Sequence, residues 1–187
     1  MLLFLIVLTG IVYSCVTAGA SGFLFPKQSQ GSFQDTPYGK MSLLAGQTYR
    51  RDEHLQGRPQ NFKTVQKNGK YCLQAAPAET AYGDEQMLSD QKMLKDEIRR
   101  KNPDASGEVP VELYTPCASG MDPDISMEAA VYQIPRIAEA SGLSEEEVKE
   151  IILDNVSSLL PNGPQKQTVR VSAVNLQIDE QISAMDK

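Results

Sequence analysis

The N-terminal 26 residues contain no Asp, Glu, Lys or Arg, and this feature limits the possible folds most. The first charged residue is Lys27, so all 18 basic and 24 acidic residues lie between it and the C-terminus. A bilayer core about 30 Å thick needs about 20 mostly apolar residues in a helix, and residues 1–25 supply them. A helix pairs its own backbone groups, so the Ser, Thr, Gly and Tyr in this stretch are tolerated. We predict one transmembrane helix over residues 1–26 and a soluble domain over residues 27–187.

Two processing events are alternatives to this helix. A signal peptide would use residues 2–8 as its apolar core and the small residues 18–20, Ala-Gly-Ala, as its cleavage site. Against cleavage, residues 22–25 continue the apolar run and no basic residue precedes it. Lipid attachment at Cys15 is the other event, although Tyr13 is too large for the usual small-residue pattern. Either event would leave a secreted or lipid-anchored binding module. The missing basic flank leaves the orientation of a helix open.

The composition is that of a folded globular protein. Hydrophobic residues make up 41% of the chain and charged residues 22%. The formal net charge is −6, so no basic excess exists to neutralise nucleic-acid phosphates. Three cysteines and one histidine give no zinc-binding cluster, and we expect no metal site. A hydrolase would have to use His54, the one histidine, with an Asp, and this third class of function has no other support in the sequence.

The soluble part predicts a mixture of helices and strands. Residues 27–70 read as loops with short strands near residues 41–44 and Val65. Apolar spacing predicts a helix over residues 87–101. Alternating apolar residues over 109–113 predict an edge strand, because the proline among them cannot donate to a ladder.

The C-terminal third holds the clearest helix signal. A helix is expected over residues 127–140, with a break at Pro135 into two shorter helices as the alternative. Residues 144–147, Ser-Glu-Glu-Glu, form a capping box, and apolar spacing continues to Leu159. Apolar residues then alternate in two phases over residues 169–178, which predicts a bulged strand. Helices and strands are not in strict alternation, so we predict an α+β fold.

Two adjacent blocks make the sequence recognisable. Residues 118–126, ASGMDPDIS, and residues 129–138, AAVYQIPRIA, closely resemble the KdpC family, the C subunit of the bacterial potassium-transporting Kdp ATPase. Residues 57–59, Gly-Arg-Pro, resemble a further motif of that family, although Gln60 stands where the family usually has Ser. The loop over residues 78–86 also departs from the family pattern.

Both ends of the chain carry matches in the same order. Residues 8–10 and 24–26 resemble the membrane segment of the family and its exit, and residues 171–176 resemble its terminal Val-Asn-x-x-x-Leu-Asn strand. The resemblance therefore spans nearly the whole chain.

The resemblance implies a non-catalytic accessory subunit of a P-type ATPase complex in the cell membrane. Its partners would be a potassium-binding, channel-like A subunit, an ATP-hydrolysing B subunit and a small one-helix F subunit. The family is described as a catalytic chaperone that raises the ATP affinity of the B subunit, so ATP shared with that subunit is the one cofactor implied, and none is expected to bind tightly. The family also places the soluble domain outside the cytoplasm. The chain lacks a GxxxxGK[ST] loop, a P-type phosphorylation motif and a potassium filter.

Four residues of the soluble part are candidates for nucleotide or partner contact. Gln133 matches the family position proposed to touch nucleotide, and Arg136 lies one turn later. Arg58 could hold a carboxylate or phosphate, or clamp a loop of its own chain. Asp122, with Asp124, could bind a cation or partner, or could cap the following helix.

Small residues and cysteines suggest two further contacts. Gly10, Ala18 and Gly22 have compatible spacing for packing against another membrane helix. Cys72 and Cys117 could form a disulfide if the domain lies outside the cytoplasm.

Overall fold

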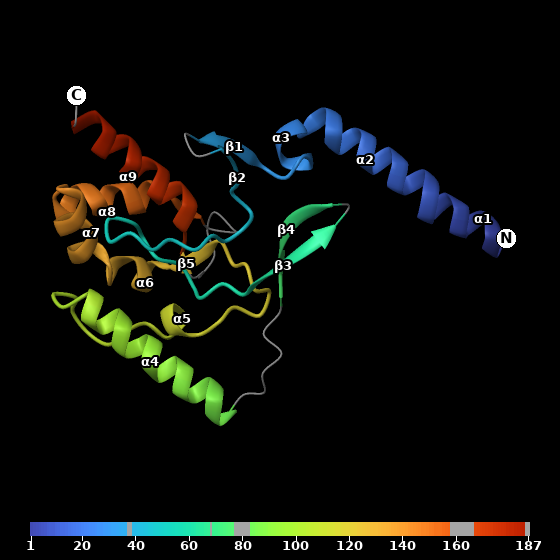
Figure 1. Cartoon of the computed structure of the whole chain (residues 1–187). Coiled ribbons are helices and arrows are strands. Elements are labelled where there is room, and N and C mark those ends of the chain that lie inside the picture. Colours follow the sequence, from blue (N-terminus) through green and yellow to red (C-terminus); the bar gives the residue numbers. More distant parts are fainter. Residues whose placement is uncertain (37–38, 68, 77–82, 158–166, 186–187) are drawn as a thin grey trace. The chain divides into compact units, whose positions relative to one another are not determined.

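The computed structural model describes residues 1–36, 39–67, 69–76, 83–157 and 167–185 (Figure 1). Within these ranges the chain divides into two compact units, Met1–Leu44 and Ala45–Lys187. An apolar helix followed by a mixed helix and strand domain confirms the predicted fold class. The boundary predicted between residues 26 and 27 concerns membrane and solvent, and it stays a prediction.

The first unit begins with one continuous helical rod. It comprises α1 (Leu2–Val7), the π-helical turn η1 (Leu8–Val12) and α2 (Tyr13–Leu24). Within its 23 residues an 18-residue window has a mean hydropathy of 2.2, and no residue of that window is buried within the chain. At 1.5 Å per residue the rod is about 35 Å long, enough to cross a bilayer core.

The rod ends where a proline begins a new turn. Phe25 leaves the helical conformation, and Pro26 opens the short α3 (Pro26–Ser29). The antiparallel strands β1 (Phe33–Thr36) and β2 (Gly39–Ser42) complete the unit. The strand predicted near residues 41–44 is confirmed in part, since β2 ends at Ser42.

The second unit starts with a hairpin and a long helix. β3 (Phe62–Lys67) contains the predicted Val65 and pairs antiparallel with β4 (Lys70–Ala75). α4 (Glu85–Lys101) confirms the helix predicted over residues 87–101. It begins two residues earlier because the Asp84 carboxylate accepts a hydrogen bond from Met87 N at 3.0 Å.

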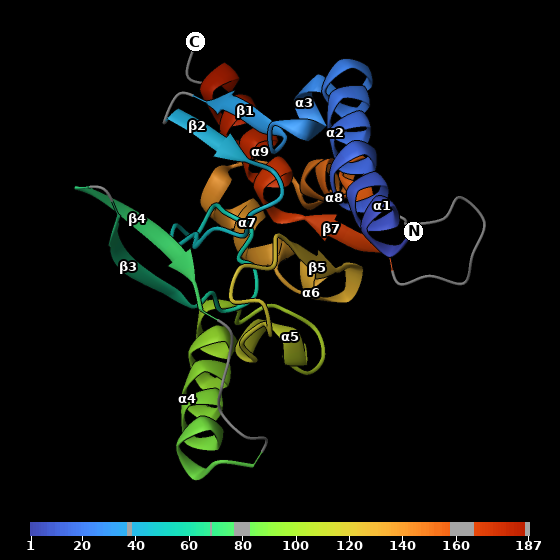
Figure 2. The same cartoon turned by 90° about the vertical axis from the view of Figure 1, so that its right-hand side faces the viewer.

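The compact core of the second unit is built by short helices around a three-stranded sheet. In the sheet, β5 (Asp124–Ser126) and β6 (Val156–Ser157) both pair antiparallel with the central β7 (Thr168–Arg170). The helices are α5 (Val111–Tyr114), α6 (Met127–Val131), α7 (Ile134–Ser141), α8 (Glu145–Asp154) and α9 (Val171–Met185). Both views show α4 beside α5 on the side of this unit away from α9 (Figures 1 and 2). Fully buried aliphatic side chains from the sheet and three helices meet between them: Ile125, Ile137, Val148, Ile152, Val169, Val174 and Ile178.

Two helix boundaries follow directly from their end residues. Pro135 lies in the first turn of α7, where no donor is needed, so the alternative of two short helices is confirmed. The capping box of α8 is also confirmed, since Ser144 and Glu147 bond each other's backbone N–H. α8 ends at Asp154 instead of near Leu159. Leu159 lies outside the described ranges, as does most of the loop over 78–86.

Two predicted strands are wholly or mostly helical in the structure, although β7 includes the first two residues of the second one. Residues 111–114 form α5. Leu113 in this helix and Val109 just before it are buried, whereas Val111 is exposed. After Arg170 the chain forms α9, which buries Val171, Val174, Asn175 and Ile178. Their spacing is that of one helix face, which explains the two phases of alternation without a bulge.

Candidate functional site

An irregular segment, residues 52–56, passes through the core of the second unit and is held there by polar side chains. Asn175 of α9 accepts from Leu55 N at 2.7 Å through Oδ1 and donates to Leu55 O at 2.9 Å through Nδ2. The Asn175 side chain therefore pairs with Leu55 as a neighbouring strand would. Leu55 and Asn175 are 0% and 1% exposed, respectively.

Gln133 repeats this pairing one residue later. Its Oε1 accepts from Gln56 N at 2.9 Å, and its Nε2 donates to Gln56 O and to Ala129 O, both at 3.0 Å. Oε1 also accepts from Arg136 at 2.8 Å. Two acceptor and two donor positions of the amide are thus used inside the chain, and the residue is 1% exposed. Nucleotide contact by Gln133 stays a prediction.

Arg136, in the first turn of α7, also holds residues 52–56 in place. Its guanidinium donates to the carbonyls of Asp52 and His54 and to Asn102 Oδ1, besides Gln133. Burial lowers the pKa of Arg136 to about 10, against the smaller raising effect of Asp52 and Glu53. The group therefore stays charged at neutral pH and satisfies four acceptors. We call Gln133, Arg136 and Asn175 the core clamp.

His54 lies at one end of the clamped segment. It is 5% exposed, and its Nε2 is 2.9 Å from Asp179 Oδ1. Arg51 also contacts Asp179 Oδ1, at 3.0 Å, and the Tyr49 ring meets the imidazole edge-on. These contacts bind residues 49–54 to α9, which gives the histidine a structural place in the fold.

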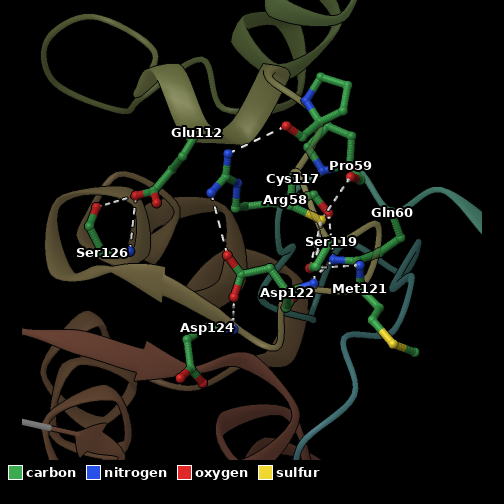
Figure 3. A network of polar contacts seen from close by, with 11 residues as sticks. Arg58, Pro59, Gln60, Glu112, Cys117, Ser119, Met121, Asp122, Asp124 and Ser126 are labelled. Atoms are coloured by element: carbon green, nitrogen blue, oxygen red, sulfur yellow. Dashed lines mark hydrogen bonds and ion pairs between the residues drawn. The ribbon is translucent and has the colours of Figure 1, made fainter. Parts of the chain in front are cut away.

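Arg58 and Asp122 form a second polar network nearer the surface, on the loop over residues 117–124 (Figure 3). Arg58 Nη1 lies 3.4 Å from Asp122 Oδ2, and Nη2 lies 3.5 Å from the Pro116 carbonyl. The two side chains are about one quarter and one third exposed. Asp122 Oδ1 accepts from Asp124 N at 3.2 Å, which tightens the acidic turn.

The acidic turn does not cap the following helix. Ser126 caps α6 by accepting from Ala129 N at 3.2 Å, and Asp124 instead pairs with Arg170 of β7 at 3.0 Å. The capping interpretation of the Asp122 and Asp124 pair is therefore wrong. Among the described residues no group of three or more His, Cys, Asp or Glu side chains is placed to hold a metal ion.

Two glycines allow the loop over 117–124 to approach its neighbours. A Cβ on Gly46 would lie 2.3 Å from the Asp122 carbonyl oxygen. Gly120 has φ +76°, and a Cβ there would lie 2.2 Å from the Ala76 carbonyl oxygen. Gln60 then bridges the loops by donating to the carbonyls of Arg58 and Asp122, at 2.9 and 3.0 Å. The residue that departs from the family pattern is therefore part of the network.

A small cavity is lined by Gln133 of the core clamp and by Arg58 and Gln60 of the surface network. Its volume is about 130 Å³, with room for about four water molecules, and it is lined in part by Gln56, Arg58 and Gln60. Each of these three residues carries a buried polar atom without a hydrogen-bond partner among the described residues: Gln56 Nε2, Arg58 Nε and Gln60 Oε1.

The other predicted contact residues lie apart from this region. Ala18 and Gly22 share a face of α2, while Gly10 lies in the π-helical turn, which shifts the helix phase. No atom lies within 4 Å of a Cβ placed on Gly10 or Gly22. Cys72 is exposed on β4 and Cys117 is buried, and both are free thiols in the structure.

Sequence reasoning named Gln133, Arg136, Arg58 and Asp122, and the structure sorts them into two adjoining networks. It missed the role of Asn175, whose position in the terminal Val-Asn motif was the available signal. It also missed Gly46 and Gly120, because only the fold shows which glycines meet a neighbouring carbonyl.

Comparisons with known proteins match nearly the whole chain to one family. The family model for KdpC, K+-transporting ATPase, c chain, matches residues 1–180. A potassium-transporting ATPase KdpC subunit of Bradyrhizobium diazoefficiens is 37% identical, over 96% of this chain and 92% of the relative. Relatives of the same name from Rhodopseudomonas palustris and Clostridium botulinum are each 35% identical, over 96% and 92% of this chain and 94% and 89% of the relatives. The chain therefore belongs to the KdpC family and is an accessory subunit of a potassium-transporting ATPase.

Proposed function

We propose that the chain is a non-catalytic subunit that assembles with the A, B and F subunits of the pump and raises the ATP affinity of the B subunit. The observation that carries this proposal is that the family match, residues 1–180, includes both the apolar helix and the clamped domain. The chain therefore contains both the membrane helix and the folded domain of a family member.

The apolar helix supplies the contact with membrane subunits. None of its residues is buried within the chain, and the space around Gly10 and Gly22 is open. Small residues allow two helix backbones to approach closely, so this helix is suited to pack against a helix of another subunit.

The soluble domain is proposed to lie outside the cytoplasm, as in the family. ATP would then act on the opposite side of the membrane, so the effect on ATP affinity would pass through the helix and the partner subunits. The closed hydrogen bonding of Gln133 supports such an indirect effect, since its amide offers no unused position to a nucleotide. A shared ATP contact remains the competing mechanism.

Topology is testable with a native residue. Cys72 is exposed, whereas Cys117 is 2% exposed. In a Cys15→Ala chain, a membrane-impermeant thiol reagent added to intact cells should label Cys72. A Cys72→Ser chain is the control for labelling elsewhere. Labelling that requires lysis would place the domain inside and favour direct contact with ATP.

The function itself is tested by replacement of a host's own C subunit. Cells that lack that subunit should regain growth at limiting potassium when this chain is expressed, and the purified complex should show a lower KM for ATP than the complex without it. Gly22→Leu should block both effects by preventing close helix approach, whereas Gly107→Leu on an open loop should block neither. Full complementation without any change in the KM for ATP would remove the chaperone role and keep assembly.

A further inference from the structure

The hairpin of β3 and β4 extends away from the rest of the second unit in both views (Figures 1 and 2). Residues that face each other across the ribbon share a face, so Thr64, Gln66, Tyr71 and Leu73 lie on one side. Tyr71 is 78% exposed and Leu73 is 70% exposed. An aromatic and an aliphatic side chain thus lie uncovered next to each other on a two-stranded ribbon, which is only marginally stable by itself.

The charge of the hairpin is opposite to that of the chain. Residues 61–76 contain Lys63, Lys67 and Lys70 and no acidic residue, while the whole chain has a formal net charge of −6. The register places Lys63 and Lys67 on the face opposite Tyr71 and Leu73. The ribbon therefore has one apolar side and one basic side.

We propose that this hairpin docks on the anionic lipid surface of the membrane that the N-terminal helix enters, with Tyr71 and Leu73 toward the acyl chains. Amphipathic elements that lie in the membrane interface share this design, with apolar residues below and lysines at the level of the headgroups. Tyr is well suited to that boundary because its ring is apolar and its hydroxyl is polar. This inference rests on the membrane helix alone, and not on ATP or subunit contacts.

Chain connectivity favours lipid as the occupant. The helix ends at Leu24 and the hairpin begins at Phe62, so 37 residues of chain, at most about 130 Å when extended, tether the ribbon to the bilayer. A tether of this kind raises the effective concentration of lipid at the hairpin, so a weak contact becomes populated. When the apolar side of the ribbon contacts the lipid, the lysines on its basic side remain within a Debye length, about 8–10 Å, of the lipid phosphates.

The test uses the full chain in lipid nanodiscs with an environment-sensitive fluorophore on the apolar face. The label is attached at Thr64→Cys in a chain that also carries Cys15→Ala and Cys72→Ser. Gln66→Cys on the same face is the second label position if the first disturbs the ribbon. Native Cys72, which lies on the basic face, is the matched position expected to report solvent. Brominated lipids measure contact with acyl chains through quenching of the fluorophore.

We expect at least threefold stronger quenching at position 64 than at Cys72 in discs that contain phosphatidylglycerol. The contrast should fall to near unity in phosphatidylcholine discs and when Lys63, Lys67 and Lys70 are replaced by Gln. Replacing Lys92, Arg100 and Lys149 by Gln changes the net charge equally on exposed positions elsewhere, and should leave quenching intact.

Equal quenching in neutral and anionic discs would overturn the electrostatic part of the proposal. Absence of quenching at both label positions in anionic discs would overturn the lipid contact altogether. A shift of the fluorophore to an apolar environment only after the other pump subunits are added would assign the face to a protein partner instead.

Discussion

Arg136 Nη2 donates a hydrogen bond to Gln133 Oε1 at 2.8 Å, and the same oxygen accepts from Gln56 N at 2.9 Å. Gln133 is the N-cap residue of α7 and Arg136 lies in the first turn of that helix, so the start of the helix sets their spacing. A charged donor and a backbone donor thus share one acceptor inside the core. The family motif around Gln133 can therefore be explained by its hold on residues 52–56.

Loss of the Gln133 side chain should weaken the fold. Gln133→Ala leaves the N–H and C=O of Gln56 buried without partners, so we expect a loss of about 3 kcal/mol in the free energy of unfolding. Urea unfolding in detergent, followed by far-UV circular dichroism, measures it. Gln181→Ala on an exposed face of α9 is the control. An unchanged midpoint combined with weaker ATP stimulation of the assembled pump would instead support nucleotide contact.

Arg136→Lys should also destabilise the protein, although the charge is kept. A lysine nitrogen cannot occupy the positions of Nε, Nη1 and Nη2 together, so acceptors such as Asn102 Oδ1 and the His54 carbonyl lose their donor. The expected loss is about 2–4 kcal/mol in the same unfolding measurement. Arg100→Lys, on the exposed side of α4, should change the midpoint little. Equal effects of the two substitutions would show that charge alone matters at position 136.

Gly120 and Gly107 form a matched pair for a test of close packing. Both have positive φ, +76° and +88°, but a Cβ at Gly120 meets a carbonyl oxygen at 2.2 Å, whereas the space at Gly107 is open. Gly107→Ala should cost only the backbone strain of about 1–2 kcal/mol. Gly120→Ala should cost clearly more and lower the yield of folded protein. Thermal unfolding of both variants decides this, and similar melting temperatures would contradict the packing argument.

The capping box of α8 predicts a pH dependence. Hydrogen bonds from the backbone N–H and hydroxyl of Ser144 lower the pKa of Glu147 below its ordinary value of 4.5. Because the pKa is lower in the folded state, the stabilisation is complete above the unfolded-state pKa and disappears as the pH falls through the folded-state value. The difference in urea midpoint between the wild type and Glu147→Gln should therefore be constant near neutral pH and shrink in acid. A difference in urea midpoint that grows as the pH falls would contradict this prediction.

Local signals in the sequence predicted those elements whose ends are set by neighbouring residues. The apolar run, the capping box of α8 and the stop of α4 at residues 101–102 all depend on contacts within one or two turns. The strand predicted over residues 109–113 failed because apolar residues two and four apart suit a strand and a helix turn equally. The strand predicted over residues 169–178 is confirmed only at residues 169–170, in β7. The rest is helical, since a helix face also produces two phases of alternation.

The site was predicted less completely than the fold. The resemblance pointed to Gln133, Arg136, Arg58 and Asp122, but many of their partners lie 34 to 84 positions away in sequence. Such pairs leave no periodic pattern. The partner of Leu55, Asn175, is 120 residues distant and became visible only when α9 was placed against the clamped segment.

The core clamp has a consequence for how the family can change in length. Residues 52–56 lie in no helix or strand, yet consecutive carbonyls and amides are matched to side chains fixed on α7 and α9. One added or deleted residue would move Leu55 and Gln56 out of step with Asn175 and Gln133. Surface loops usually accept insertions, but this loop should accept none, and its amides should exchange with solvent as slowly as those of the central helices.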